Sequence, residues 1–296
     1  MPAEKFEKLL NNKKIVISDG ATGTNLMRMG LPNGKAAEHW VLENPDAIIR
    51  LHEEFIASGS DILLTCTFGA SKTRLEMKGL VEEFSQINQK AVALAQHASK
   101  GTDLLIAGSI GPLGQMLKPI GLMDESDAEQ VYADQVHVLC DSGVDLILIE
   151  TQFDLTEAHA AVRGVKSVCD LPIICSFSFD RGTKTMMGVS PSAFAQSFNG
   201  AGLYALGINC GKSLEDNLAA LQMLNEATTL PIWFKPNAGL PKISSSGQTE
   251  YDVTPDLMAK HVPSWIANGA RFIGGCCGTS PAHLKEISTA VHATIE

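Results

Sequence analysis

Short apolar runs alternate with longer amphipathic segments along the chain, and this alternation constrains the fold more than any other feature. Eight of the runs are rich in Ile, Leu, Val or Phe and show little polar–apolar alternation, which is typical of parallel strands buried on both faces. The predicted strands cover residues 14–18, 61–65, 104–108, 145–149, 172–176, 205–209, 231–235 and 271–275.

Segments with helical periodicity separate these strands, and several begin beside a Ser, Thr or Asp cap or a proline. The predicted helices cover residues 44–59, 81–98, 125–142, 154–168, 190–198, 213–227, 254–268 and 280–293. Eight strand–helix units predict an α/β fold, a (β/α)8 TIM barrel that forms a single domain over residues 1–296. An open doubly wound sheet is the alternative, but it usually has fewer units, and the sequence contains neither a GxGxxG nor a P-loop motif.

The composition limits the kinds of partner that the chain can have. The net charge of -10 and the lack of clustered Lys or Arg argue against a nucleic-acid partner, whose phosphates require basic patches. No apolar run approaches the ~18 residues of a membrane helix, and the polar first dozen residues lack the apolar stretch of a secretory signal. We therefore expect a cytoplasmic protein, in which the 7 cysteines are better explained by metal binding or catalysis than by disulfides.

Polar and thiol residues follow the predicted strands at their carboxyl ends, where barrels of this type carry their chemistry. In chain order these residues are Asp19, Gly20, Thr65, Cys66, Thr67, Ser109, Glu150, Thr151, Ser176, Ser178, Asn209, Cys210, Asn237, Cys276 and Cys277. Their common placement predicts one shared site at the barrel mouth. The longest irregular stretch, residues 239–249, is predicted to be a mobile loop over that mouth.

Three cysteines support the sharpest hypothesis about this site. Zinc prefers thiolate ligands, and a catalytic zinc keeps three protein ligands and one open position. Cys210 follows the sixth predicted strand, while Cys276 and Cys277 follow the eighth, so the three could meet above the barrel. Consecutive side chains in a strand point to opposite faces, but the glycines of the GGCCG segment allow backbone dihedrals that bring both thiols to one metal. The alternatives are a pair of buried structural thiols or a vicinal disulfide.

The other cysteines and the acids at the strand ends are less specific signals. Cys140, Cys169 and Cys175 lie in or at the end of predicted helices or inside a strand, and we expect them to be structural residues of the core or surface. Asp19 and Glu150 both follow strands, so two carboxylates at the mouth could act as acid and base or hold a substrate ammonium. The structural alternatives are a loop cap for Asp19 and a helix-dipole partner for Glu150.

Seven short motifs occur in a fixed order along the chain. They are DGATGT (19–24), LTCTFGA (64–70), GSIGP (108–112), ET (150–151), GINC (207–210), KPNAG (235–239) and GGCCGT (274–279). Together they resemble the homocysteine S-methyltransferase family, and within it the homocysteine-binding barrel of cobalamin-dependent methionine synthases is the most similar. The resemblance covers nearly the whole chain, and GINC together with GGCCGT is highly specific.

The resemblance implies a zinc-dependent enzyme with homocysteine as methyl acceptor. Zinc would be held by Cys210, Cys276 and Cys277. A free alkyl thiol with a pKa of about 8.5 carries little thiolate at neutral pH, so zinc would stabilise the thiolate of homocysteine. That sulfur would then attack an electrophilic methyl group, and the product would be methionine.

The resemblance also implies roles for residues around the substrate. The homocysteine ammonium would meet Asp19 and Glu150, and its carboxylate would meet backbone N–H groups around Gly20 and Ala21. Asn237 matches a position that fills the fourth zinc site when substrate is absent. The predicted substrate-binding residues are Asp19, Gly20, Ala21, Thr67, Ser109, Glu150, Asn209 and Asn237.

The chain departs from the family pattern in two ways. Similar members have Asn in the TxTF motif where this chain has Cys66, which adds a fourth thiol near the site. The chain also has no room for folate, corrinoid or activation modules, so we expect a separate methyl-corrinoid protein as donor, with a small sulfonium such as S-methylmethionine as the alternative. Two other hypotheses compete: a metal-free barrel that uses the two acids as acid and base, and a non-catalytic, zinc-stabilised binding module.

Overall fold

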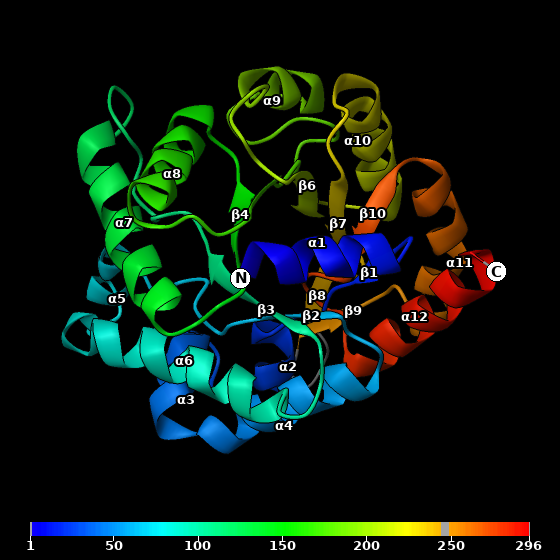
Figure 1. Cartoon of the computed structure of the whole chain (residues 1–296), viewed down its shortest axis with the longest axis horizontal. Helices are drawn as coiled ribbons and strands as arrows, with labels where there is room; N and C mark the ends of the chain where they lie inside the picture. The colour runs from blue at the N-terminus through cyan, green and yellow to red at the C-terminus, as the bar shows by residue number, and fades with distance from the viewer. Residues whose placement is uncertain (1, 244–248, 296) are drawn as a thin grey trace.

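Eight parallel strands form a closed barrel at the centre of the molecule (Figure 1). The structure is a computed structural model that describes residues 2–243 and 249–295. The barrel strands are β1 (Val16–Ile17), β2 (Ile62–Leu64), β3 (Leu105–Ile110), β4 (Leu146–Gln152), β5 (Ile173–Phe177), β6 (Ala205–Cys210), β7 (Ile232–Pro236) and β10 (Ala270–Ile273). They pair in the order β1-β10-β7-β6-β5-β4-β3-β2, and a parallel bridge between Ser18 and Ile62 joins β1 to β2. The predicted (β/α)8 barrel is therefore confirmed.

The helices around the barrel occupy the segments predicted from periodicity. They are α4 (Pro45–Ala57), α6 (Phe84–Ala98), α7 (Glu125–Asp141), α8 (Leu155–Val168), α9 (Pro191–Ser197), α10 (Leu214–Ala227), α11 (Pro255–Ala267) and α12 (Pro281–Ile295). Polar caps explain where several begin: the side chains of Asp154, Ser190 and Ser213 accept hydrogen bonds from first-turn N–H groups of α8, α9 and α10. Within the described part of the chain, no helix combines the length and the apolar character needed to cross a bilayer.

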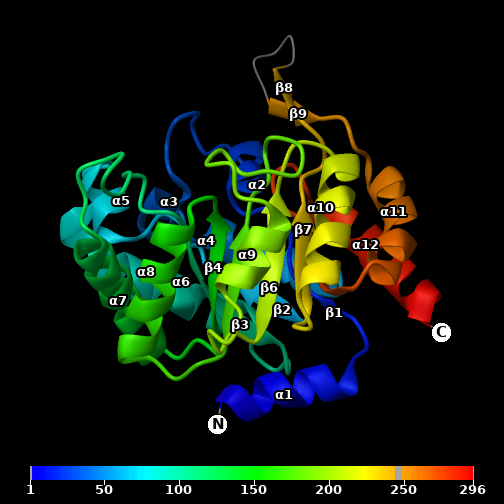
Figure 2. The same cartoon turned by 90° about the horizontal axis from the view of Figure 1, so that it is seen from above.

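Short elements at the two ends of the barrel were not predicted. They are α1 (Pro2–Asn12), α2 (Gly23–Arg28), α3 (Ala37–Glu43), α5 (Lys72–Glu76), β8 (Pro241–Ile243) and β9 (Thr249–Tyr251), whereas the 3-10 turn η1 (Val81–Glu83) is the start of the helix predicted over 81–98. The α1 helix lies across the amino-terminal end of the barrel, where the Phe6 ring stacks on Phe272 at 5.9 Å between centroids, and the β8–β9 hairpin stands at the opposite end (Figure 2). The prediction of an irregular loop over residues 239–249 is therefore wrong where β8 and β9 pair. Residues 244–248 of that stretch lie outside the described residues.

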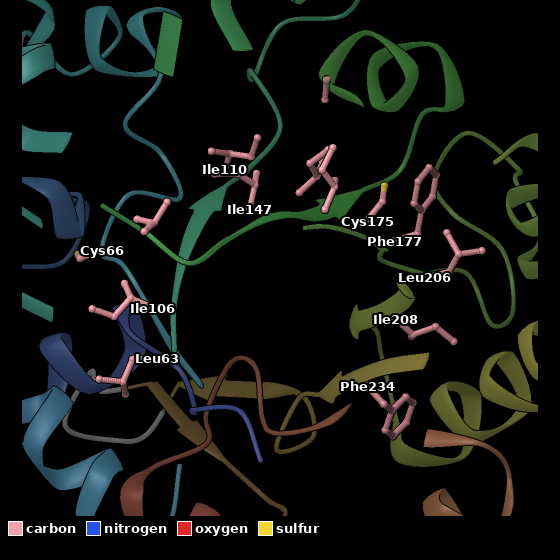
Figure 3. Close-up of a cluster of buried hydrophobic side chains, with 14 of the residues drawn as sticks. Leu63, Cys66, Ile106, Ile110, Ile147, Cys175, Phe177, Leu206, Ile208 and Phe234 are labelled. Atoms are coloured by element: carbon pink, nitrogen blue, oxygen red, sulfur yellow. The ribbon is translucent and has the colours of Figure 1, made fainter. Parts of the chain in front are cut away.

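Side-chain alternation along the strands divides the core into two layers. Leu148 and Trp233 belong to a layer inside the barrel, while their chain neighbours Ile147 and Phe234 belong to the layer between strands and helices. Figure 3 shows this outer set around the ring of strands. The last inward position of each strand therefore faces the barrel mouth.

Gly207 on β6 allows the neighbouring Trp233 on β7 to fit inside the barrel. A Cβ at Gly207 would lie 2.8 Å from the Trp233 Cβ. We expect Gly207→Ala to lower the free energy of unfolding by about 1–3 kcal/mol, because overpacking forces a strand or a side chain to move. Urea unfolding followed by circular dichroism measures this change. Gly23→Ala, where the added Cβ meets no atom within 4 Å, is the control and should not destabilise; equal stability of the two variants would refute the packing argument.

Cys140 and Cys169 form a disulfide, so the expectation that metal binding or catalysis explains the cysteines better than disulfides is wrong for this pair, although its members are structural as predicted. They are 29 positions apart, about one strand–helix unit, so they lie at the same end of the neighbouring helices α7 and α8. Their proximity follows from how the two helices pack, and no local sequence pattern marks it. Cys175 is buried in the outer core layer, as predicted.

Candidate active site and metal centre

Five polar side chains form a ring at the carboxyl end of the barrel, which we call the mouth ring. They occupy the last inward positions of β3 to β7 and, in that order, are Ser109, Glu150, Ser176, Asn209 and Lys235. Each is at most 8% exposed, so the ring lies below the surface. Alternation explains it, because the positions two residues earlier, such as Leu148 and Trp233, face the inner core. The predicted gathering of polar residues at this end is confirmed.

A cluster of three cysteines lies beside the mouth ring. Cys210 Sγ lies 3.0 Å from Cys276 Sγ and 4.0 Å from Cys277 Sγ, and all three sulfurs lie within 4.8 Å of one another. Three thiolates bound at 2.3 Å to one tetrahedral ion would lie about 3.8 Å apart, so the cluster fits such an ion and leaves its fourth position open. The hydrogen bonds among the three thiols lower the pKa of Cys277 and raise that of Cys210, so in the absence of a metal they stabilise one thiolate in the cluster, that of Cys277.

Cys210 reaches the cluster through an unusual backbone turn. Strand alternation would point the side chain after Asn209 away from the barrel interior, but Cys210 has a φ of 61°, in the left-handed region. The Asn217 amide donates a 2.8 Å hydrogen bond to the Cys210 carbonyl, and the Asn237 amide donates one of 2.8 Å to the Gly211 carbonyl. These two amides hold the turn that directs Cys210 toward its partners.

Gly274 and Gly275, which precede the cysteine pair, are needed because they have no side chain. The prediction that they supply unusual backbone dihedrals is therefore wrong for these two glycines. A Cβ at Gly274 would lie 2.6 Å from the Asp19 carbonyl oxygen, and one at Gly275 would lie 2.4 Å from the Thr279 side chain. Of the three glycines in this segment, Gly278 alone has a positive φ, of 83°. The cysteine pair therefore approaches the cluster because the backbone of β10 packs tightly against the segment that follows β1.

Thr151, which follows Glu150, is held in a strained conformation by Asn209. Its φ is 61°, which is a genuine outlier for a β-branched residue. The Asn209 Oδ1 accepts hydrogen bonds from the Thr151 N–H at 2.9 Å and from the Ser176 hydroxyl at 2.6 Å, and its Nδ2 donates to the Thr151 hydroxyl at 2.7 Å. Asn209 thus fixes the end of β4 and the orientation of Glu150 next to it.

Removing this clamp should reduce catalysis more than metal content. We expect Asn209→Ala to lower kcat/KM of the reaction at this site by about 10- to 100-fold, the usual effect of losing a residue that orients direct ligands. Bound metal per chain, measured by elemental analysis, should stay near the value of the unmodified protein. Unchanged kinetics would show that the Asn209–Thr151 contacts do not position the site.

A buried ion pair joins β7 to the segment after β1. Lys235 Nζ lies 2.6 Å from Asp19 Oδ1, and the two side chains are 3% and 1% exposed. The second oxygen of Asp19 accepts a 2.8 Å hydrogen bond from the Leu64 N–H. Burial alone would lower the pKa of Lys235, but the charges of Asp19 and Glu150 raise it, so this side chain is a fixed cation.

Glu150 is the second buried carboxyl of the site. Burial raises its pKa to about 7, against the opposing charge of Lys235. Its Oε1 accepts a 2.5 Å hydrogen bond from the Ser109 hydroxyl. The carboxyl therefore changes charge near neutral pH, within reach of an amino group bound in the pocket.

A cavity of about 530 Å³ opens over the mouth ring and the cysteine cluster. At its base lie Ser109, Glu150, Thr151, Lys235 and the three cysteines, and the segments after β1 and β2 form the other walls. Larger apolar and charged side chains of those segments that line it include Met27, Leu31, Lys35, Glu38, Phe68, Arg74 and Lys78. Cys66 also lines it, and burial raises the pKa of this thiol, so it is held neutral. Among the described residues, the metal-ligand cluster consists of the three cysteines without Cys66.

The sequence model for homocysteine S-methyltransferase matches residues 16–291 of this barrel. The chain belongs to the homocysteine S-methyltransferase family. The family assignment expected from the motifs is thereby confirmed.

Relatives of two different lengths contain a barrel similar to this one. The methionine synthase of Mycobacterium tuberculosis is 28% identical over 297 residues, which cover 95% of this chain but 25% of that protein. The chain thus spans about a quarter of the length of the curated relatives it matches. The metallated form of the homocysteine methyltransferase MmuM from Escherichia coli superposes with a TM-score of 0.82 at 28% identity, over 96% of this chain and 99% of that one.

The cavity separates the predicted substrate residues into two groups. Gly20, Ala21, Ser109 and Glu150 line it, together with the three cysteines. Asp19, Thr67, Asn209 and Asn237 do not belong to its lining and hold other parts of the site in place. The Ala21 N–H, expected near the substrate carboxylate, donates to the Thr279 carbonyl and hydroxyl oxygens at 3.3 and 3.1 Å.

Sequence reasoning missed Lys235, although it ends the seventh predicted strand and so carries the same signal as the other members of the mouth ring. It also missed Phe68 and Arg74, which reach the cavity from the segment after β2. Nothing in the local pattern distinguishes these two residues from an ordinary solvent-facing turn.

Proposed function

We propose that this chain transfers a methyl group to the thiol of homocysteine and so forms methionine. The observation that carries the proposal is the cluster of Cys210, Cys276 and Cys277, whose sulfurs lie within 4.8 Å of one another at the base of a cavity that also contains Glu150. Soft ligands at this spacing suit zinc, and a three-cysteine site leaves one position for a substrate sulfur. A cytoplasmic location stays a prediction, because the free thiols of the cluster favour reducing conditions whereas the Cys140–Cys169 disulfide favours oxidising ones.

The residues of the chain fit this chemistry without an acid–base step. Cys210, Cys276 and Cys277 would hold zinc, which would lower the pKa of the substrate thiol, release its proton to solvent and keep the sulfur nucleophilic. Glu150 binds the substrate ammonium, and the buried mouth ring orients the sulfur and excludes water. Asn237 keeps its Oδ1 buried without a hydrogen-bond partner in the described residues, which suits a ligand for the fourth position when substrate is absent.

The size of the cavity favours a small methyl donor bound within the barrel mouth. The volume of about 530 Å³ extends past the cysteines to Met27, Leu31 and Phe68, whose apolar side chains can surround a methyl-bearing sulfonium such as S-methylmethionine. A separate methyl-corrinoid protein is the alternative donor, and the likeness to methionine synthases supports it.

The first test combines metal analysis with a donor comparison. Protein purified under reducing conditions should contain one zinc per chain and should methylate homocysteine in the presence of S-methylmethionine. Turnover with a methyl-corrinoid protein and none with the sulfonium would assign the alternative donor. Zinc-edge X-ray absorption should show a sulfur ligand gained on adding homocysteine; a closed four-ligand site that ignores homocysteine, or turnover that survives complete metal removal, would refute the proposal.

A further inference from the structure

Arg74 is a cation of the cavity wall that has no carboxylate partner. It belongs to α5, in the segment after β2, and its side chain lines the cavity. Within the described part of the chain its guanidinium makes no ion pair, and its Nε is buried without a hydrogen-bond partner. A partly buried cation without a partner is costly for the free protein, and an anionic ligand would remove that cost.

The other three cations that line the cavity each lie within 3.0 Å of a carboxylate oxygen. The pairs are Lys35 with Glu43 at 2.5 Å, Lys78 with Glu38 at 3.0 Å and Lys235 with Asp19 at 2.6 Å. The charged groups of the lining that remain without such a partner are Arg74, Glu150 and the cysteine cluster. Arg74 is therefore the lining cation that is free to receive an anion.

Arg74 and the cysteine cluster lie on opposite sides of the barrel mouth. The strands form a closed ring of eight in which β2 and β6 are separated by four steps in either direction. The segment that carries Arg74 follows β2, whereas Cys210 ends β6. The cavity of about 530 Å³ spans this width and has the size of a site for a drug-sized ligand. A thiol substrate bound at the cysteines thus leaves the Arg74 side to a second reactant.

A buried carboxyl holds the turn on which Arg74 rests. A Cβ at Gly114 would lie 2.7 Å from a terminal nitrogen of the guanidinium, so Arg74 packs directly on this turn. The neighbouring Leu113 N–H donates a 2.7 Å hydrogen bond to Glu157, whose carboxylate also accepts one of 2.8 Å from the Tyr132 hydroxyl. Burial raises the pKa of Glu157, and the more distant charge of Arg74 opposes that shift. The support of Arg74 is therefore in place before a ligand binds, which lowers the cost of binding.

We propose that Arg74 binds an anionic group, a carboxylate or a phosphate, that the methyl donor carries. This inference rests on the proposed function, since it concerns the second reactant of that reaction. The planar guanidinium matches the oxygen pairs of both anions and binds them through charge-assisted hydrogen bonds. A donor held in this way has its anion at the β2 side and can direct its methyl group toward the cysteines across the mouth.

The test compares two sulfonium compounds that differ in one charge. 3-Dimethylsulfoniopropionate carries methyl groups and a carboxylate but no amino group, and its methyl ester lacks the negative charge. Arg74→Met removes the cation and leaves no carboxylate without its ion pair, whereas Arg74→Lys keeps the charge. Lys72→Met is the matched control, because Lys72 lies on the same helix, pairs with Asp134 at 2.5 Å and does not line the cavity.

Calorimetry on the zinc-loaded proteins measures the ratio of the two affinities. The unmodified protein and Lys72→Met should bind the acid at least about tenfold more tightly than the ester, the lower range for a charge-assisted hydrogen bond. In Arg74→Met this ratio should fall to near one, and Arg74→Lys should keep part of it. The affinity for homocysteine should be the same in all four proteins, since the thiol substrate binds on the other side of the mouth.

Acetate and inorganic phosphate, used as competitors of 3-dimethylsulfoniopropionate, distinguish the two anions. Stronger competition by acetate assigns a carboxylate-bearing donor, and stronger competition by phosphate assigns a phosphate-bearing one, provided that the effect is lost in Arg74→Met. The inference is overturned if the unmodified protein does not prefer the acid, if Arg74→Met keeps the preference, or if homocysteine binding weakens as much as sulfonium binding. These affinities do not depend on turnover, so a lack of methyl transfer would refute the proposed function alone.

Discussion

Cys210→Ala should abolish both metal binding and methyl transfer. Cys210 contributes one of three sulfurs, and its loss leaves two adjacent thiols that cannot hold a four-coordinate ion with an open position. We expect zinc content to fall to background and kcat/KM to fall by well over a hundredfold, beyond the 10- to 100-fold effect of residues that only orient ligands. Elemental analysis and a methionine-formation assay on the same preparations measure the two losses.

Cys175→Ala is the matched control for this substitution. Cys175 is also a buried free cysteine on a barrel strand, in the middle of β5, but it belongs to the outer core layer and does not line the cavity. It should keep full zinc content and activity, with only a modest loss of stability from the deleted sulfur. Full activity in Cys210→Ala would remove the thiol cluster from the chemistry and would favour a metal-free mechanism through the acids.

Glu150→Gln should weaken homocysteine binding and at the same time stabilise the metal-free fold. Losing one member of a buried charge pair costs about 3 kcal/mol, so KM should rise on the order of a hundredfold. In the substrate-free protein the same carboxyl lowers the stability of the fold. Burial raises its pKa to about 7, and ionising it above that pH destabilises the native state. Gln keeps an oxygen for the Ser109 hydroxyl and has no charge to bury.

The raised pKa of Glu150 determines at which pH Glu150→Gln is more stable than the unmodified protein. Because the folded-state pKa of Glu150 lies above its value in the unfolded chain, the carboxyl favours the native state below about pH 4.5, and this contribution is lost as pH rises through 7. Each pH unit between the two pKa values is worth about 1.4 kcal/mol, so the variant should exceed the unmodified protein by up to about 3 kcal/mol near pH 8. Urea unfolding of both metal-free, reduced proteins measures the difference. A variant that is less stable at every pH would contradict the assigned burial cost.

The barrel and most of its elements could be predicted because their causes are local. Eight apolar runs and eight capped amphipathic segments match the observed strands and main helices within a few residues. The short elements α1 and the β8–β9 hairpin were missed because three to eleven residues contain too few periods to stand out. The Cys140–Cys169 pair was missed because it depends on how two neighbouring helices are placed.

The sequence predicts which residues gather at the site, but it does not predict which contacts each of them makes there. Strand ends in a parallel barrel meet at one face, so the polar ring and the three cysteines follow from the sequence alone. The pairing of Asp19 with Lys235 does not, because the two residues are 216 positions apart and meet only when β1 closes onto β10 and β7. For the same reason the sequence could not show that Asn209 holds Thr151 and that Asn237 holds the Cys210 turn, while their predicted contacts with substrate stay predictions.

The sequence by itself determined the fold, the family and which three cysteines gather at the barrel mouth, because periodicity, capping and motif order depend on neighbouring residues. The tertiary structure alone decided which charged groups face the cavity, because burial and pairing depend on neighbours brought together by barrel closure. Asp19 and Glu150 look equivalent along the chain, but in the folded protein Asp19 is paired with Lys235 outside the cavity lining, whereas Glu150 lines the cavity.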